Sequence, residues 1–180
     1  MLARIIAVAF ALLVAVMPAR AADKENLQLF RDVQRQVLQY THFTIFDNVE
    51  AQVDRGIVTL TGKVTMPYKR DDIAQRIGKL ALVKEVRNQI TVLPVSQFDD
   101  DLRFGIARAI YSNSNFRPYA FMVNPPIHVI VENGRVTLEG VVNSEVDRVL
   151  ARSIASNFLA FDVKNELKTE AEVKQELEKL

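Results

Sequence analysis

Few side chains in this sequence have the types and spacing that catalysis or metal binding requires. The 180 residues include two histidines and no cysteine. A metal site needs several imidazole, thiolate or carboxylate ligands close together, and neither His42 nor His128 has such companions in the sequence. Ser153 and Ser156 have no histidine and acid nearby to activate a nucleophile. The sequence therefore predicts no catalytic residue, no metal and no cofactor.

Two further patterns that can bind ligands favour structural roles. The run Asp99–Asp101 precedes an apolar periodic segment, and acidic residues are stabilised at a helix N-terminus by the helix dipole. Gly56, Gly62, Gly134 and Gly140 do not form a phosphate-binding loop, because they lie within hairpins and not between a strand and a helix.

The elements that carry these residues occur twice. Residues 54–64 and 132–142 share the pattern acid-x-Gly-x-Val-Thr-Leu-x-Gly-x-Val, 78 residues apart. Further along, the sequence Val-Arg-Asn-Gln-Ile at 86–90 matches Val-Lys-Asn-Glu-Leu at 163–167. Two copies are too few for a solenoid, so the repeat predicts two small tandem domains.

Each copy has the pattern of an αββαβ unit. In the first copy, helical apolar spacing over 30–37 precedes two alternating strands, 49–53 and 58–64, joined by a Gly turn. A second helical stripe over 73–81 leads to a third strand over 86–92, which such a crossover places parallel to its neighbour. The fold class is therefore α+β, with two tandem αββαβ domains, each a three-stranded mixed sheet covered by two helices.

The second helix of each unit begins with a capping signal. Thr65 stands two residues before Pro67, which predicts Thr65 as N-cap and proline in the first turn. In the second copy, Ser144 and Asp147 have the spacing of a capping box.

The repeated glycines and asparagines have structural interpretations. Two glycines fit hairpin turns, and two fit strand interiors where a missing side chain admits a helix or marks a bulge. The recurring asparagine of the third strand could contact a ligand, but a buried amide must be hydrogen-bonded, which favours a bond to the backbone where the sheet meets a helix end. These motif residues are Gly56, Gly62, Asn88, Gly134, Gly140 and Asn165.

The N-terminus reads as a secretory signal peptide, residues 1–21. Arg4 precedes an apolar run of about 13 residues, too short for the roughly 20 of a membrane span, and Ala19-Arg-Ala21 fits a cleavage site. We expect a periplasmic product with no transmembrane span in the mature chain. Its domains are expected at 22–94 and 95–169, with a charged C-terminal tail at 170–180. Its near-neutral charge argues against binding nucleic acid.

The repeated motifs resemble the BON domain, a bacterial module of osmotically inducible periplasmic proteins and outer-membrane lipoproteins. The resemblance rests on Gly-x-Val-x-Leu-x-Gly-x-Val at 56–64 and 134–142 and on Val-x-Asn-x-Ile/Leu at 86–90 and 163–167. It spans about residues 27–93 and 99–169. It implies phospholipid binding, with the second domain's first helix and adjoining loops as the contact region.

One segment, 112–126, departs from the repeat, because it is longer than its counterpart and rich in aromatic residues. These aromatics could fill the seam between the domains. Alternatively, they could contact lipid or a protein partner, with arginines attracted to anionic lipid at about 1 kcal/mol each. The candidate residues for binding a lipid or a partner are Arg103, Arg108, Phe116, Arg117, Tyr119, Phe121 and Met122.

The leading hypothesis is a non-enzymatic envelope protein that binds anionic phospholipid surfaces in envelope maintenance or osmotic stress. The alternative is a periplasmic chaperone or adaptor for unfolded envelope proteins, which also needs an exposed apolar surface. An enzyme would require a polar pocket with titratable groups, and the sequence predicts none.

Overall fold

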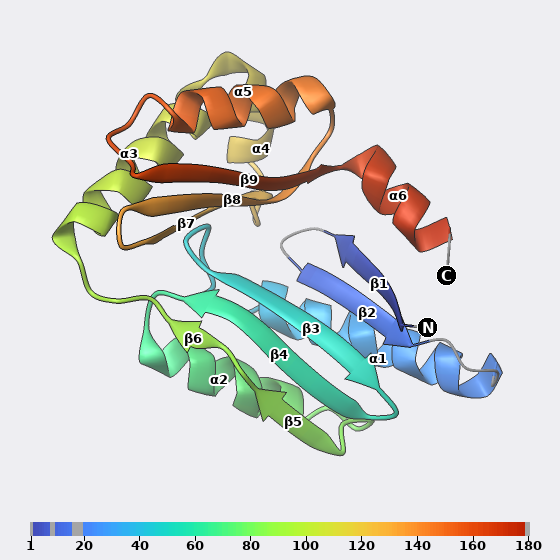
Figure 1. The fold of residues 1–180 in the computed structure, drawn as a ribbon. Coiled ribbons are helices and arrows are strands. Elements are labelled where there is room, and N and C mark those ends of the chain that lie inside the picture. Colours follow the sequence, from blue (N-terminus) through green and yellow to red (C-terminus); the bar gives the residue numbers. More distant parts are fainter. Residues whose placement is uncertain (1, 8–9, 16–19, 179–180) are drawn as a thin grey trace.

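The two repeats fold as two αββαβ units in a computed structural model, which describes residues 2–7, 10–15 and 20–178 (Figure 1). The first unit contains α1 (Arg20–Leu38), β3 (Asn48–Asp54), β4 (Ile57–Val64), α2 (Pro67–Gly78), β5 (Glu85–Asn88) and β6 (Thr91–Val92). Strands β3 and β4 are antiparallel, whereas β5 and β6 both pair with β4 in parallel. The predicted third strand is thus present but interrupted.

The second unit repeats this order with an insertion after its first helix. Its elements are α3 (Gln97–Ser112), the 3-10 turn η1 (Ser114–Phe116), α4 (Arg117–Ala120), β7 (Ile127–Glu132), β8 (Arg135–Val142), α5 (Glu145–Ala155) and β9 (Asp162–Thr169). Strands β7 and β8 are antiparallel, and β9 is parallel to β8. The α+β class and the predicted unit are confirmed in both copies.

Each unit buries one face of its sheet under its own two helices. Alternating strand residues such as Val58 and Leu60 meet helical residues such as Val33 and Ile77 in the first core. The second core is built in the same way from the other repeat. These two separate cores account for the period-2 and period-3.6 patterns of the sequence.

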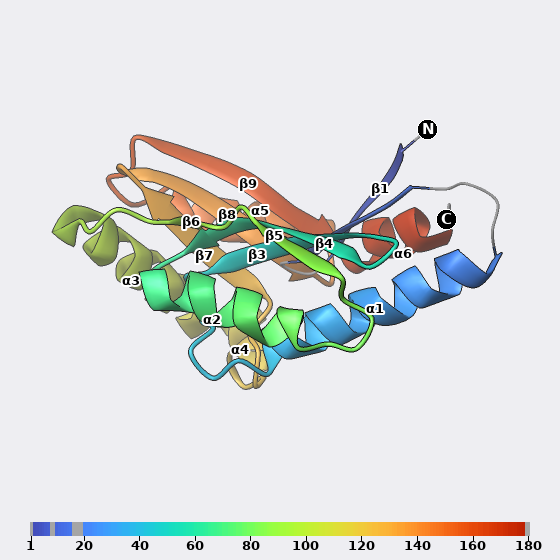
Figure 2. The same ribbon diagram turned by 90° about the horizontal axis from the view of Figure 1, so that it is seen from below.

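The two sheets face each other, so the molecule is layered as helices, sheet, sheet, helices (Figure 1; Figure 2 is the view from below). Polar side chains meet between the sheets: Asn48 of β3 donates to the carboxylate of Glu139 on β8, and Lys63 of β4 pairs with Glu132 of β7. Backbone contact adds to this, since the Val129 N–H donates to the Ile45 carbonyl (2.8 Å).

The predicted signal peptide lies partly outside the described residues, which exclude 1, 8–9 and 16–19. Within 1–21, the structure describes β1 (Leu2–Ala7), β2 (Phe10–Ala15) and the start of α1. Strands β1 and β2 form an antiparallel hairpin, and β2 pairs in parallel with β3 at the edge of the first sheet. At the other terminus, the segment expected to be a charged tail contains α6 (Glu170–Glu178).

The repeated glycines have the backbone conformations that their positions require. Gly56 and Gly134 turn the hairpins at φ +87° and +73°. Gly62 and Gly140, inside strands, also have positive φ, and a Cβ on Gly140 would lie 1.8 Å from the carbonyl oxygen of Pro126. The missing side chain therefore admits the neighbouring strand's backbone, not a helix.

The repeated asparagines bind the backbone in the same way in both units. The side-chain amide of Asn88 donates to the Arg70 carbonyl in α2 (3.1 Å), and that of Asn165 donates to the Arg148 carbonyl in α5 (2.9 Å). Each side-chain oxygen accepts the N–H two residues on. Each asparagine therefore ties the third strand to the second helix.

The N-cap role of Ser144 and the place of Pro67 in the first turn of α2 are confirmed, whereas Thr65 as N-cap is wrong. Ser144 is the N-cap of α5 and accepts from the Asp147 N–H (3.2 Å). Thr65 is not the N-cap of α2. That position belongs to Met66, which makes no side-chain cap, while the Thr65 hydroxyl bonds to Asp47 (2.9 Å).

Candidate functional site

The aromatic segment after α3 divides into a buried part and an exposed part. Phe116 is 0% exposed and Tyr119 is 3% exposed, and both belong to the core of the second domain. Their rings stack with centroids 6.0 Å apart. Both are therefore unavailable to a membrane or partner, which corrects the expectation that they contribute to a contact surface. The buried residues of this core all come from the second domain, and Ile45 and Phe46 of the first domain pack against it.

Arg103 is also unavailable as a surface cation. Its side chain is buried, donates to the Val131 carbonyl (3.0 Å) and pairs with Asp100 (3.0 Å). The sequence contains a signal for this burial, because positions 103, 106, 107 and 110 form an i, i+3, i+4, i+7 stripe on α3. Arg103 thus ties α3 to β7.

Three consecutive apolar side chains remain exposed just after α4. Phe121 is 84% exposed, Met122 48% and Val123 97%. Arg117 and Arg108 are also exposed, and within the described residues neither forms an ion pair. We call Phe121, Met122 and Val123 the apolar tip. Single exposed apolar residues are common on proteins, but three in succession are not needed to close either core.

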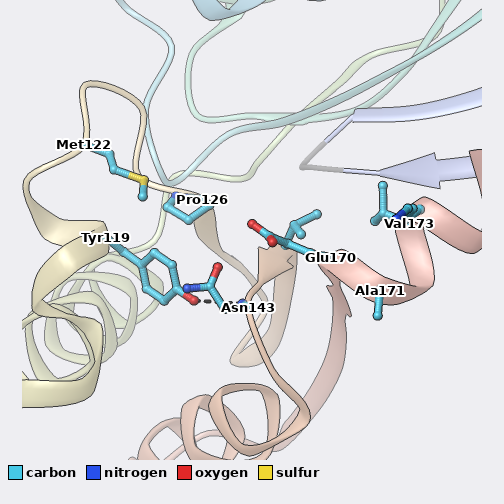
Figure 3. A pocket seen from close by; sticks show the side chains of 9 residues that line it. Tyr119, Met122, Pro126, Asn143, Glu170, Ala171 and Val173 are labelled. Atoms are coloured by element: carbon cyan, nitrogen blue, oxygen red, sulfur yellow. Dashed lines mark hydrogen bonds between the residues drawn. The ribbon is translucent and has the colours of Figure 1, made fainter.

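A pocket of about 670 Å³ lies beside the apolar tip (Figure 3). Met122 and Pro126 lie on one side of it, and α6 closes the other with Ala171 and Val173 (Figure 3). At its base, the Tyr119 hydroxyl accepts from the Asn143 N–H (2.8 Å) and donates to Asp147 (3.3 Å). Burial raises the pKa of this hydroxyl, so it stays protonated. The pocket suits an apolar ligand group, with Lys174 and Glu170 among the lining residues.

The end of the same segment does lie at the domain junction. A smaller pocket of about 160 Å³ is lined by residues 123–126 of the second domain and by Leu38, Phe43 and Ile45 of the first. Residues 112–126 therefore divide between different surroundings, and the contact of the exposed part with lipid or a partner stays a prediction. The middle of the segment packs in the second core, its end meets the first domain, and the apolar tip faces outward.

Sequence reasoning missed a buried ion pair in the first domain. The Asp47 carboxylate binds the Lys69 ammonium (2.7 Å) and accepts from the backbone N–H and hydroxyl of both Thr44 and Thr65, at 2.7 to 2.9 Å. Both charged side chains are buried. The carboxylate therefore has a full set of partners and serves structure. Thr44 is local to Asp47, but the local sequence gives no signal for the ion pair itself, because Thr65 and Lys69 come from the segment around the start of α2.

Asp99 has a second role that the sequence reasoning also missed. It stands in the first turn of α3, as predicted for the Asp99–Asp101 run. Its buried carboxylate also accepts from the Asn133 N–H (2.8 Å) and the Gly134 N–H (2.7 Å). It thus fixes the β7–β8 turn.

Within the described residues, no group of histidine or acidic side chains could hold a metal ion. His42 lies in edge contact with the rings of Tyr40 and Tyr68. His128 is buried between the domains, with its Nδ1 2.6 Å from the Asp47 carbonyl oxygen. No described helix has the length and apolar character that crossing a membrane would demand.

Comparison with known proteins agrees with this duplicated architecture. A family model described as the BON domain matches residues 28–94 and again 99–171. No curated protein matches the chain. Two solved structures of CdsD, a structural protein of the type III secretion system of Chlamydia trachomatis, are 14% and 13% identical. They cover 93% and 90% of this chain and 85% of each of those chains, with TM-scores of 0.30 and 0.32, too low to bear on function. The two family matches together span most of the sequence, and on this basis the chain belongs to the BON domain family as a tandem two-domain member.

Proposed function

We propose that this protein is a non-enzymatic envelope protein that binds anionic phospholipid surfaces through the apolar tip of its second domain. The observation that carries the proposal is the exposure of Phe121, Met122 and Val123 in succession beside an apolar pocket. Side chains of this kind enter the boundary between headgroups and acyl chains, where their burial is favourable. Membership of the BON family supports the lipid class.

Two cations give the surface its preference for anionic lipid. Arg117 opens α4, four residues before Phe121, and Arg108 lies on the exposed side of α3. Each would contribute about 1 kcal/mol near an anionic surface, and salt screens this attraction. Since Arg103, Phe116 and Tyr119 are buried, the surface is smaller than the sequence-based set of candidates.

The protein is proposed to act in the periplasm after cleavage behind Ala21. Arg4, the short apolar run and the Ala19-Arg-Ala21 site support this. N-terminal sequencing of periplasmic material should find Ala22 as the first residue. An intact Met1 in that material would contradict the proposed export route.

Flotation of the processed protein with vesicles tests lipid binding. We expect the floated fraction to rise with phosphatidylglycerol content and to fall as salt rises. Replacing Arg108 and Arg117 by Glu should abolish flotation at low salt. The matched control replaces two exposed cations of the first domain, Arg31 and Lys79, and should float normally. Equal flotation of both double variants would contradict the proposed surface.

A second candidate function, a periplasmic chaperone or adaptor, is favoured by the pocket between Met122 and α6. Its volume of about 670 Å³ is large enough for apolar side chains of an unfolded envelope protein. Holding such a client requires apolar contact but no anionic lipid. Suppressed aggregation of an unfolded outer-membrane protein, together with no flotation at any lipid composition, would favour this function.

A further inference from the structure

The surfaces on which the two domains meet carry both carboxylates and lysines. The sheet faces turned away from the helices carry charged and polar side chains from both domains. From the first domain they are Asn48, Glu50, Thr61 and Lys63, and from the second they are Glu132, Glu139, Lys164, Glu166 and Lys168. The set holds four carboxylates and three lysines, and Glu50 is its one carboxylate from the first domain.

Glu139 is the acidic group most affected by this position. It projects from the middle of β8, half-buried, and accepts from the Asn48 amide across the junction. Glu50 of β3 and Glu166 of β9 both act on it as like charges, while Lys63 and Lys164 are the cations near it. Glu50 and Glu166 thus act on Glu139 from opposite domains, and Glu166 is itself exposed and paired with Lys164 (2.5 Å).

The electrostatics follow from this geometry. Burial raises the pKa of Glu139 to about 7, helped by the negative charges of Glu50 and Glu166 and opposed by the Asn48 hydrogen bond and by Lys63. The pKa of Glu50 is also raised, by burial first and then by Glu166, against the effects of Lys168 and Thr61. Both shifts favour the neutral acid when the domains are together.

The direction of the pH effect follows by linkage. When the domains separate, Glu139 returns towards its ordinary pKa of 4.5, so the closed arrangement binds a proton that the open one releases. The closed arrangement is therefore favoured at low pH, and this advantage is lost as pH rises through about 7. Between pH 5.5 and 8 the open-to-closed ratio should rise about tenfold or more.

We propose that the junction between the two sheets is a proton-dependent clamp, closed when Glu139 is protonated and loosened when Glu50, Glu139 and Glu166 are all charged. The clamp sets how tightly the second domain is held against the first. It does not depend on what the apolar tip binds.

His128 provides an internal contrast, since it titrates with the opposite effect. It extends from β7 to the Asp47 carbonyl of the first domain, and burial lowers the pKa of its ring. Burial disfavours its charged form more than Asp47 and Thr44 favour it, so protonating His128 would loosen the contact as pH falls. A contact that tightens on acidification therefore reports the carboxylates.

Energy transfer between the two outer helix layers tests the clamp. The chain has no cysteine, so Gln75→Cys on α2 and Arg152→Cys on α5, both exposed, give two unique labelling sites. At constant ionic strength, transfer in the processed full chain should be highest near pH 5.5 and should fall towards pH 8. Transfer that stays constant, or that rises with pH as His128 alone would cause, overturns the proposal.

Variants locate the effect. With Glu139→Gln, which resembles the protonated acid, transfer should stay high and should lose most of the parent's fall between pH 5.5 and pH 8. The matched control Glu85→Gln changes an exposed carboxylate of the first domain and should retain the pH dependence of the parent. If Glu139→Gln retains the parent's fall, the proposal is wrong. The parent titration decides the matter by itself if that variant does not fold.

Discussion

The two domains share one fold but use different chemistry where the second strand leads into the second helix. In the first domain, the buried Asp47 carboxylate accepts from the Thr65 N–H (2.8 Å). In the second, the Tyr119 hydroxyl accepts from Asn143 at the corresponding place (2.8 Å). A hydroxyl on the inserted α4 thus replaces a carboxylate on the loop before the first strand.

The exposed apolar surface of the second domain lies in the same insertion as this hydroxyl. Tyr119 bonds to the connection between β8 and α5 and belongs to the second core, so it holds α4 against that core. The chain leaves the core after α4. Phe121, Met122 and Val123, which directly follow α4, are exposed. The first domain has no such insertion and closes the junction with an ion pair.

The largest loss of stability is expected at Gly140, a strand position where both domains have a glycine with positive φ. Gly140→Val adds a side chain at φ +121° and within 1.8 Å of the Pro126 carbonyl oxygen. Backbone strain and overpacking together should cost about 3–6 kcal/mol. Urea unfolding should show a large loss of stability. The control Gly78→Ala, with only the Val86 side chain at 3.8 Å, should change the midpoint little.

The next largest loss of stability is expected when the buried ion pair of the first domain is broken. Asp47→Ala leaves the buried Lys69 ammonium without its partner, which should destabilise the first domain by about 3–5 kcal/mol. Asp54→Ala, which removes the exposed pair with Arg55, should cost less than about 1 kcal/mol. Similar urea midpoints for these two variants would show that the buried pair does not stabilise the connection between β4 and α2.

The repeated asparagines should respond alike. Asn88→Ala and Asn165→Ala each remove the same two hydrogen bonds, so each should cost about 1–2 kcal/mol. Chemical denaturation of the two variants should give equal losses within about 0.5 kcal/mol. A loss in one domain only would mean that the strand-to-helix tie is not shared.

A smaller effect is expected for the hydroxyl of the second domain. Tyr119→Phe keeps the buried ring but removes the bonds to Asn143 and Asp147. Since Asn143 is exposed and water can replace the lost acceptor, the cost should be about 1 kcal/mol. A loss as large as that of Asp47→Ala would remove the contrast between the two junctions.

Local signals account for what the sequence predicted well. The turn glycines, the alternating strands and the Ser144 cap depend on a few neighbouring residues, and the repeat supplied each signal twice. The αββαβ order could therefore be predicted. The Asp47 and Tyr119 junctions could not, because each joins segments that are distant in the sequence and become neighbours only through packing.

The sequence also could not predict which individual side chains of the candidate site are buried. Phe121 and Tyr119 have the same aromatic character and stand two positions apart, yet one is exposed and the other buried. The insertion has no regular period from which a buried face could be assigned. Arg103 is a different case. Its position in the buried stripe of α3 predicts burial, but charged side chains are rarely buried, so its charge favours a place on the surface.

Flotation of variants matched between the domains tests the central claim most directly. Phe121→Ser with Val123→Ser removes the two most exposed side chains of the apolar tip, whereas Met66→Ser with Tyr68→Ser removes exposed apolar side chains at the start of α2 in the first domain. With phosphatidylglycerol vesicles, we expect the first pair to weaken binding at least about tenfold at every salt concentration, because apolar contact is not screened. The second pair should bind like the parent. Normal binding by the apolar-tip variant, or equal losses in both pairs, would contradict a membrane contact specific to the second domain.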